Sequence, residues 1–230
     1  MRNTLSVYII AYVGLLLYVL ALLYIYPKPE LHLLLNSFHT HTVDTFFKYY
    51  STLAEWPLYI LALLPIIWKK TEITILFAMS EISGGIILQI LKHFFSSDRP
   101  ACVFERCHDM VLPVVDGVSL HHSNSFPSGH ASTFFVFFTC IAIYLAYRYK
   151  KSGEHSRKKL ILTNLLMVLL LILAVLGGYS RIYLSQHFLS DVCVGSIIGF
   201  ITPFLFFHFA KDKIIQLKKY IENSKVKAQK

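Results

Sequence analysis

Six runs of apolar residues, separated by shorter polar stretches, dominate the chain. Each run is long enough to cross, or nearly cross, the roughly 30 Å hydrocarbon core of a bilayer as a helix. The second run is the shortest, and we expect its helix to begin earlier, around Phe46. The runs cover residues 5–26, 54–68, 73–95, 130–147, 160–178 and 190–209. This pattern predicts an all-α bundle of six transmembrane helices.

A mixed, aromatic segment at residues 30–47 separates the first two runs. Such a segment is typical of chain that lies at the membrane interface. Its histidines are interpreted as ordinary interfacial residues: His32, His39 and His41. The charged residues 211–230 predict a solvated tail. No internal repeat divides the chain, so we expect a single integral-membrane domain over residues 1–230.

The composition supports a membrane protein. Hydrophobic residues make up 55% of the chain and charged residues only 15%, whereas a soluble domain carries roughly a quarter charged residues. The formal net charge of +9 would suggest nucleic-acid binding in a soluble protein. The distribution of the basic residues along this chain gives a different explanation.

Most Lys and Arg residues fall in those connections of the predicted bundle that lie on one side of the membrane. With a cytoplasmic N-terminus, 16 of the 22 fall on the cytoplasmic side, at positions 2, 69–70, 148–159 and 211 onward. The other six face outward: Lys28, Lys48, Lys92, Arg99, Arg106 and Arg181. Because cytoplasmic loops of membrane proteins carry the excess of Lys and Arg, we predict a multi-pass protein of the cytoplasmic (inner) membrane. Both termini are then cytoplasmic, and no nucleic-acid partner is expected.

Three of the outward cations, Lys92, Arg99 and Arg181, lie at or near the ends of predicted spans. Taken singly, each is explained by a side chain that reaches from a helix end to the headgroups. Together they are more informative, because each lies near histidine, serine or glycine on the same face of the membrane. The clusters are Lys92–Pro100, Pro127–His130 and Ser180–Asp191.

The spacing within these clusters suits an anion site. Seven residues separate Lys92 from Arg99, so two helical turns would return them to one face. Gly129 stands where a helix is expected to begin, and the free N–H groups of a helix start attract anions. His187 and Asp191 are four residues apart, which places them on one face of the last predicted helix.

Phosphoryl transfer is the chemistry that these residue types favour. Fixed cations and helix N-terminal amides neutralise a phosphate and the charge that develops on it. A neutral imidazole can attack phosphorus while an adjacent carboxylate orients the ring. A second histidine can protonate the leaving oxygen.

The three clusters contain three blocks of defined spacing, which are Lys92-x6-Arg99-Pro100, Pro127-Ser128-Gly129-His130 and Ser180-Arg181-x5-His187-x3-Asp191. They resemble, without departure, the three-part signature of the type 2 phosphatidic acid phosphatase superfamily. The resemblance covers residues 92–191, and the predicted spans are similar to those of its bacterial membrane branch. A single block recurs by chance, but three in order on one membrane face make a specific pattern.

The resemblance implies a role for each matching residue. His187 is the implied nucleophile that forms a phosphohistidine, Asp191 its partner, and His130 the general acid. The implied phosphate cradle consists of Lys92, Arg99, Ser128, Gly129 and Arg181. The family works without a metal or other cofactor. Its vanadium haloperoxidase relatives share the cradle but are soluble, and the predicted spans argue against them.

Other residues invite competing interpretations. Cys102 and Cys107 lie in a polar loop, and the sequence leaves open whether they form a disulfide or remain two free thiols. Their spacing with the neighbouring histidines, His108, His121 and His122, fits no zinc pattern. Glu81 falls within an apolar run and is interpreted as a buried structural glutamate, either hydrogen-bonded or protonated, in preference to a catalytic one. The pair Gly195-x3-Gly199 predicts close helix packing.

The sequence therefore predicts an integral-membrane lipid phosphatase with its site at the outer face of the membrane. The substrate is a phosphate monoester or diphosphate whose tail stays in the bilayer. Candidates are a polyprenyl diphosphate such as undecaprenyl diphosphate, lipid A, phosphatidic acid and phosphatidylglycerophosphate. The alternative is a lipid transporter or scramblase that uses the same cations to bind headgroups. The oligomeric state stays open.

Overall fold

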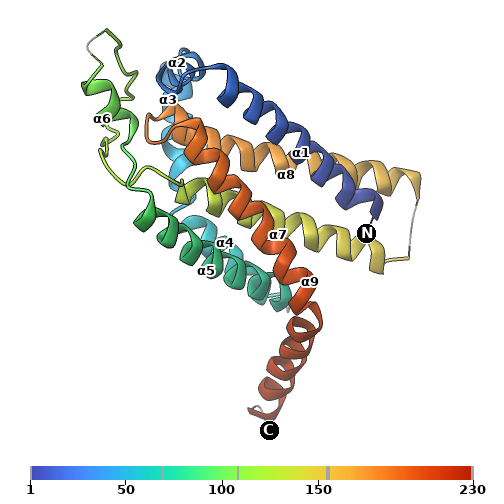
Figure 1. Cartoon of the computed structure of the whole chain (residues 1–230). Helices are drawn as coiled ribbons and strands as arrows, with labels where there is room; N and C mark the ends of the chain where they lie inside the picture. The colour runs from blue at the N-terminus through green and yellow to red at the C-terminus, as the bar shows by residue number, and fades with distance from the viewer. Residues whose placement is uncertain (1, 69, 108, 154–155, 229–230) are drawn as a thin grey trace.

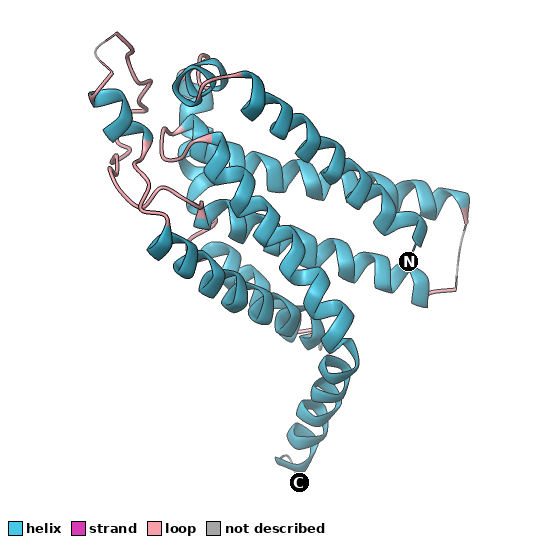
Figure 2. Cartoon of the chain, in the orientation of Figure 1, coloured by secondary structure: helices cyan, strands magenta, loops and turns pink. Residues whose placement is uncertain are grey.

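The computed structural model describes residues 2–68, 70–107, 109–153 and 156–228. His108 and the last two residues of the predicted tail lie outside the described residues. Within them every regular element is a helix (Figures 1 and 2). The elements are α1 (Arg2–Ile25), α2 (Lys28–Leu35), α3 (His41–Thr52), α4 (Pro57–Leu63), the 3₁₀ helix η1 (Leu64–Ile66), α5 (Thr71–Phe94), α6 (Pro100–Glu105), α7 (Gly129–Lys151), α8 (Arg157–Tyr183) and α9 (Leu189–Ala228).

Five helices of the described residues are long and apolar enough to cross a membrane. They are Thr4–Ile25, Thr71–Phe94, Gly129–Lys151, Arg157–Tyr183 and Leu189–Phe209. Each corresponds to one predicted apolar run, with bounds that differ from it by at most five residues. The all-helical, multi-span class is confirmed.

The prediction of six spanning helices is not confirmed, because residues 54–68 form no such helix. They contain α4 and η1, which make one short apolar helix over Pro57–Ile66. At about 1.5 Å per residue, this stretch covers roughly half of a bilayer core. Pro57 and Pro65 each stand in the first turn of a helical element. A proline inside a longer helix would remove a hydrogen bond and clash with the preceding turn, so it divides the segment.

Helix α7 lies at the centre of the bundle and packs against α5, α8 and α9 (Figure 1). In its apolar stretch 67% of the residues are buried, a larger share than in any other spanning helix of the described residues. Aromatic side chains fill the surrounding core. Tyr12 stacks on Phe200 with ring centroids 3.8 Å apart and meets Phe135 of α7 edge-on at 5.6 Å. Helices α1, α7 and α9 are therefore held together by interleaved rings.

Small residues let α9 approach α7 closely. A Cβ at Gly199 would overlap the carbonyl oxygen of Ser132, and a Cβ at Gly195 would overlap that of Ser128. The predicted role of the Gly195-x3-Gly199 pair in close helix packing is confirmed. Gly195 also fixes the distance between α9 and the first turn of α7, where two of the predicted site residues lie.

The two ends of the bundle differ in character. Helices α2, α3 and α6 and the long loop before α7 gather at one end, and α7 ends and α8 begins at the other (Figure 1). Helix α9 continues to Ala228 without a break, so the predicted tail is helical and extends away from the bundle (Figure 1).

Replacing Gly199 by alanine should destabilise the protein, because the added methyl group meets a backbone oxygen that cannot move aside alone. We expect a loss on the order of 1–3 kcal/mol, as for other overpacked interiors. Thermal melting in detergent measures it. Gly85→Ala on α5 is the matched control, because nothing lies within 4 Å of a Cβ there. Equal melting temperatures for the two variants would contradict the tight α7–α9 contact.

Candidate active site

The predicted site residues come together where four helix ends meet. Lys92 lies in the last turn of α5 and Arg181 in the last turn of α8, and α7 and α9 begin beside His130 and Asp191. Three loops join these ends. Backbone hydrogen bonds tie the loops together, from Arg99 N to His122 O (3.0 Å), from Ser125 N to Ser97 O (2.9 Å) and from Ser128 N to Asp191 O (3.0 Å).

His187 and Asp191 form the buried centre of the site. The side chain of His187 is 3% exposed and that of Asp191 0%, and His187 Nδ1 lies 3.7 Å from Asp191 Oδ2. This distance is too long for a hydrogen bond, and His187 Nδ1 is buried without a hydrogen-bond partner. Asp191 accepts hydrogen bonds from Ser125 Oγ (2.5 Å), Phe188 N (3.0 Å) and Ser190 Oγ (3.1 Å). These bonds fix the carboxylate that faces the imidazole.

The His187 ring is neutral near neutral pH. Burial lowers the pKa of His187 from 6.5 to about 4, because the imidazolium would lose its hydration. Arg181 and Arg99 lower this pKa further, while Asp191 opposes them. A neutral ring keeps a lone pair for attack on an electrophile.

Three cations surround this centre and are held by neutral acceptors. Lys92 Nζ donates to Asn124 O (3.0 Å), Arg99 Nε to Ser123 O (2.9 Å), and Arg181 NH1 to Ser51 Oγ (2.5 Å). No carboxylate of the described residues pairs with any of the three. Arg181 Nε is buried without a partner, and burial lowers the pKa of Arg99. The cations therefore have charge and donors free for an anion.

The turn before α7 brings an anion-binding helix start to the same place. Ser128 is the N-cap of α7, and its Oγ accepts from Ala131 N at 3.4 Å. The peptide bond between Phe126 and Pro127 is cis. A Cβ at Gly129 would meet nothing within 4 Å, so the space above this glycine is open. A ligand can thus approach the free amides of the first turn.

His130 lies at the mouth of the site. It lines a polar pocket of about 260 Å³ together with Arg181 and Gln186. Its Nε2 atom lies 3.8 Å from Glu55 Oε1, and the His130 side chain is 30% exposed. The eight predicted residues thus surround one site: a buried neutral histidine backed by aspartate, three cations, a helix start and a second histidine near solvent.

A family model described as the PAP2 superfamily matches residues 73–215, more than half of the chain. The chain belongs to the PAP2 superfamily. The resemblance found in the sequence is therefore confirmed.

Several PAP2-related proteins are similar to this chain. The Bacillus subtilis (strain 168) protein named phosphatidylglycerophosphatase B is 33% identical over 139 residues, which are 60% of this chain and 58% of the relative. An Arabidopsis thaliana protein named probable lipid phosphate phosphatase 4 is 33% identical over 104 residues, 45% of this chain and 31% of the relative. The chain thus matches only part of the length of these relatives.

Solved structures share the fold. The crystal structure of Aquifex aeolicus LpxE superposes with a TM-score of 0.58 at 26% identity, over 78% of this chain and 94% of that one. A Bacillus subtilis structure titled a PAP2 type phosphatidylglycerolphosphate phosphatase gives a TM-score of 0.60 at 19% identity, over 92% and 98%. At that identity the second comparison shows the fold alone.

The PAP2 signature did not identify every residue of the site. Ser51 and Glu55 come from the end of α3 and the following turn, and they reach Arg181 and His130. Because they are four residues apart, they lie near each other on a helical turn. No pattern in the sequence predicts that they lie beside Arg181 and His130. Ser125, the donor to Asp191, lies just before the second signature block.

His32 differs from its predicted role as an ordinary interfacial residue. It is 2% exposed, and its Nε2 lies 3.3 Å from Ser185 Oγ. Asn36 Nδ2 donates to the same hydroxyl at 2.9 Å. Ser185 has a φ of 53°, a conformation that few non-glycine residues adopt. Helix α2 therefore supports the turn that carries His187.

The other candidate residues have structural surroundings. Glu81 Oε1 accepts hydrogen bonds from Tyr59 OH (2.8 Å) and Thr133 Oγ1 (2.6 Å), as predicted for a structural glutamate. Cys102 and Cys107 are free thiols. In the described part of the chain, no three His, Cys, Asp or Glu side chains are grouped as a metal site.

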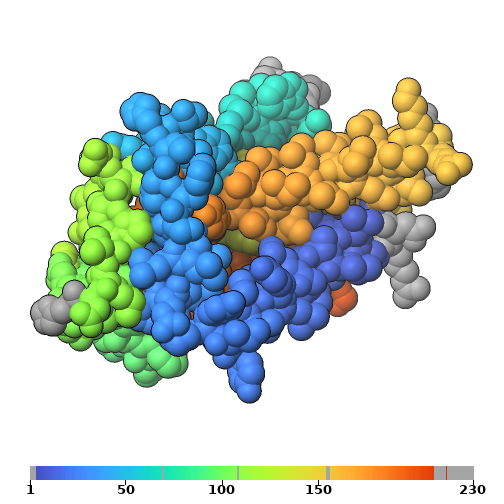
Figure 3. All heavy atoms as spheres, turned by 90° about the horizontal axis from the view of Figure 1, so that it is seen from above, coloured from blue at the N-terminus to red at the C-terminus, as the bar shows by residue number. Residues whose placement is uncertain are grey.

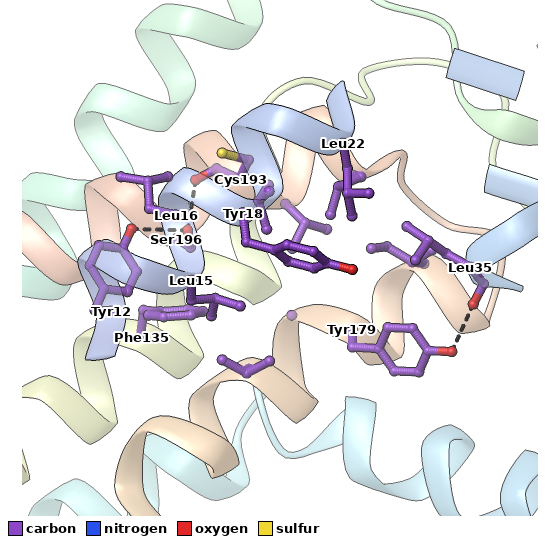
Figure 4. Close-up of a pocket in the computed structure, with 16 residues that line it drawn as sticks. Tyr12, Leu15, Leu16, Tyr18, Leu22, Leu35, Phe135, Tyr179, Cys193 and Ser196 are labelled. Atoms are coloured by element: carbon purple, nitrogen blue, oxygen red, sulfur yellow. Dashed lines mark hydrogen bonds between the residues drawn. The ribbon is translucent and has the colours of Figure 1, made fainter. Parts of the chain in front are cut away.

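An apolar pocket of about 160 Å³ lies between α1, α8 and α9, with Phe135 of α7 on its wall (Figure 4). Figure 3 shows the corresponding hollow between α1 and α8. Ile182 and Val192 line it and directly follow Arg181 and Asp191 in the chain. Tyr179 closes one side, and its hydroxyl donates to Leu35 O at 2.7 Å. The lining of this pocket is suited to hydrocarbon.

In the ligand-free protein the His187 ring should stay neutral down to about pH 4. Since an unfolded histidine takes up a proton near pH 6.5, stability contributed by this group is present above that pH. It is lost as the pH falls from 6.5 to about 4. Histidine ¹⁵N NMR measures the titration, and His187→Asn assigns the resonance. A His187 midpoint near 6.5 would contradict the effect of burial.

Proposed function

We propose that this PAP2 protein is a lipid phosphatase that works through a phosphohistidine on His187 and without a metal. The observation that carries the proposal is a buried neutral histidine backed by a buried aspartate and faced by three cations that no described carboxylate neutralises. The names of its relatives, phosphatidylglycerophosphatase and lipid phosphate phosphatase, support the same class.

In the first step His187 attacks phosphorus. A proton on Nδ1 faces Asp191, which leaves the Nε2 lone pair as the nucleophile. An N–P bond forms while the bond from phosphorus to the lipid oxygen breaks. His130 protonates that oxygen as it leaves. Charge on the phosphoryl oxygens is stabilised by the cations and the α7 amides: Lys92, Arg99 and Arg181, with Ser128 and Gly129 at the helix start.

In the second step water hydrolyses the phosphohistidine. His130, now neutral, accepts a proton from the attacking water, whose oxygen forms the new bond to phosphorus. The N–P bond breaks and the electron pair returns to His187. Inorganic phosphate leaves, and both histidines regain their starting protonation.

The membrane setting suits an amphiphilic substrate. We propose that the site lies on the outer face of the cytoplasmic membrane, with both termini cytoplasmic. Five spanning helices allow this because α3, α4 and η1 together lead the chain back from the site end of α1 to the opposite end of the bundle, where α5 begins (Figure 1). The excess of Lys and Arg in residues 148–159, at the α7–α8 connection, supports this orientation. A polar pocket beside His130 and an apolar pocket between α1, α8 and α9 fit the two parts of a lipid. Polyprenyl diphosphates, lipid A, phosphatidic acid and phosphatidylglycerophosphate are the classes to compare, by phosphate release from purified protein.

His187→Ala should abolish phosphate release, because the nucleophile is lost. Asp191→Asn should reduce it by roughly 10²–10⁴-fold, because the ring loses its orienting charge. Phosphate release in detergent measures both, and acid-labile ³²P on the protein reports the intermediate. Binding of the lipid headgroup should survive in His187→Ala. Unimpaired function in this variant would instead favour a lipid transporter or scramblase, which needs the cations but not the His187–Asp191 pair.

Excess EDTA should leave activity unchanged, whereas vanadate should inhibit, because it takes the five-coordinate geometry of the transition state and binds to the same cations. Phosphate release measures both effects. Activity that collapses with EDTA and returns with Zn²⁺ or Mg²⁺ would refute the metal-free mechanism. Arg99→Ala should weaken vanadate inhibition by about tenfold or more, since a charge-assisted bond is lost.

A further inference from the structure

Glu55 is the carboxylate nearest to the proposed general acid. Its Oε1 lies 3.8 Å from His130 Nε2, and its side chain is 54% exposed. Among the described residues that line the pocket beside His130, Glu55 is the only acidic one. It lies in the turn between α3 and α4, outside every block of the family signature.

The charged groups that face His130 from the other helix ends are cations: Lys92 on α5, Arg99 before α6 and Arg181 on α8. The neutral ring of His187 lies before α9. Lys48 and His121 line the same pocket. A general acid must nevertheless hold a proton when substrate is bound. Glu55 supplies the one negative charge within salt-bridge distance of His130 in the described structure.

Glu55 is attached to a well-anchored part of the chain. One turn earlier, Ser51 accepts a hydrogen bond from Arg181 NH1 at 2.5 Å. Tyr50 OH donates to Leu173 O at 2.8 Å, and the ring of Phe47 lies 4.6 Å from that of Tyr183. Helix α3 is therefore fixed against α8, and the turn that carries Glu55 begins beside the site.

A carboxylate at this position acts against substrate binding, because it repels a phosphate. A residue that served only to build the pocket would favour binding and turnover alike. Glu55 is instead placed to weaken anion binding and to stabilise an imidazolium. Removing its charge should therefore slow turnover without weakening the binding of an anion.

We propose that Glu55 is a positioning residue that holds His130 in its protonated form for transfer to the leaving lipid oxygen. This inference rests on the proposed function. No proton passes to Glu55 itself. When His130 has lost its proton to the leaving group, it regains one from the water that hydrolyses the phosphohistidine, and the carboxylate again stabilises the cation.

Glu55→Gln should lower kcat for an alkyl phosphate such as phosphatidic acid by about tenfold at neutral pH. The alkaline limb of its pH profile should move to lower pH by about one unit, the effect of one nearby opposite charge. Inhibition by vanadate should stay equal or become tighter, because a repulsive charge is gone. The pH dependence of kcat and the vanadate inhibition constant measure these effects.

The leaving group provides a second test. Nitrophenolate leaves without a proton, so formation of the phosphoenzyme from p-nitrophenyl phosphate should be unchanged in Glu55→Gln. Glu55→Asp, which keeps the charge, should keep the wild-type alkaline limb. Glu30→Gln removes an exposed carboxylate from α2 and should change neither kcat nor the pH profile.

Equal losses on the lipid and on p-nitrophenyl phosphate, or an unmoved alkaline limb in Glu55→Gln, would overturn the role of Glu55. If Glu55→Gln does not fold, as judged by melting in detergent, Glu55→Asp decides: a displaced alkaline limb there contradicts the proposal. A wild-type protein that releases no phosphate and forms no phosphoenzyme would contradict the proposed function instead, whatever the Glu55 variants do.

Discussion

The buried carboxylate of Asp191 lies where two separate stretches of the chain meet. The carboxylate accepts hydrogen bonds from the hydroxyl of Ser125 and the backbone N–H of Phe188. The backbone carbonyl of Asp191 accepts a further hydrogen bond from the N–H of Ser128. A buried carboxylate without such donors costs several kcal/mol. The loops before α7 and before α9 therefore hold their positions together, and the imidazole of His187 is placed by the same contacts.

Around this junction three cations are arranged so that an anion can bind between them. Lys92, Arg99 and Arg181 donate to backbone carbonyls or to a hydroxyl, which orient them without neutralising them. Their mutual repulsion is relieved when a phosphate binds, so ligand should stabilise the folded protein. The close α7–α9 contact at Gly195 and Gly199 keeps the helix start and the aspartate at a fixed separation while this charge changes.

Much of the fold and most of the site were predictable from the sequence. An apolar run of about 20 residues has one solution in a bilayer, a helix that satisfies its own backbone hydrogen bonds. Five runs accordingly match five helices. The signature residues were found because each stands at the end of such a run, so the helix ends themselves bring residues 92, 130, 181 and 187 to one end of the bundle.

The exceptions are positions at which local pattern and tertiary contact disagree. Residues 54–68 are apolar enough for a span, yet two prolines divide them into α4 and η1. Glu55 and His32 look like ordinary residues near a membrane surface, and neither has a periodicity that points to a function. Helix α3 packing on α8 carries Glu55 to His130, and α2 lying over residues 184–188 buries His32. Apolar length and helix-end chemistry are local properties that the amino-acid order specifies. The partners of a polar side chain are set by which helices pack together, and that was decided by the three-dimensional fold.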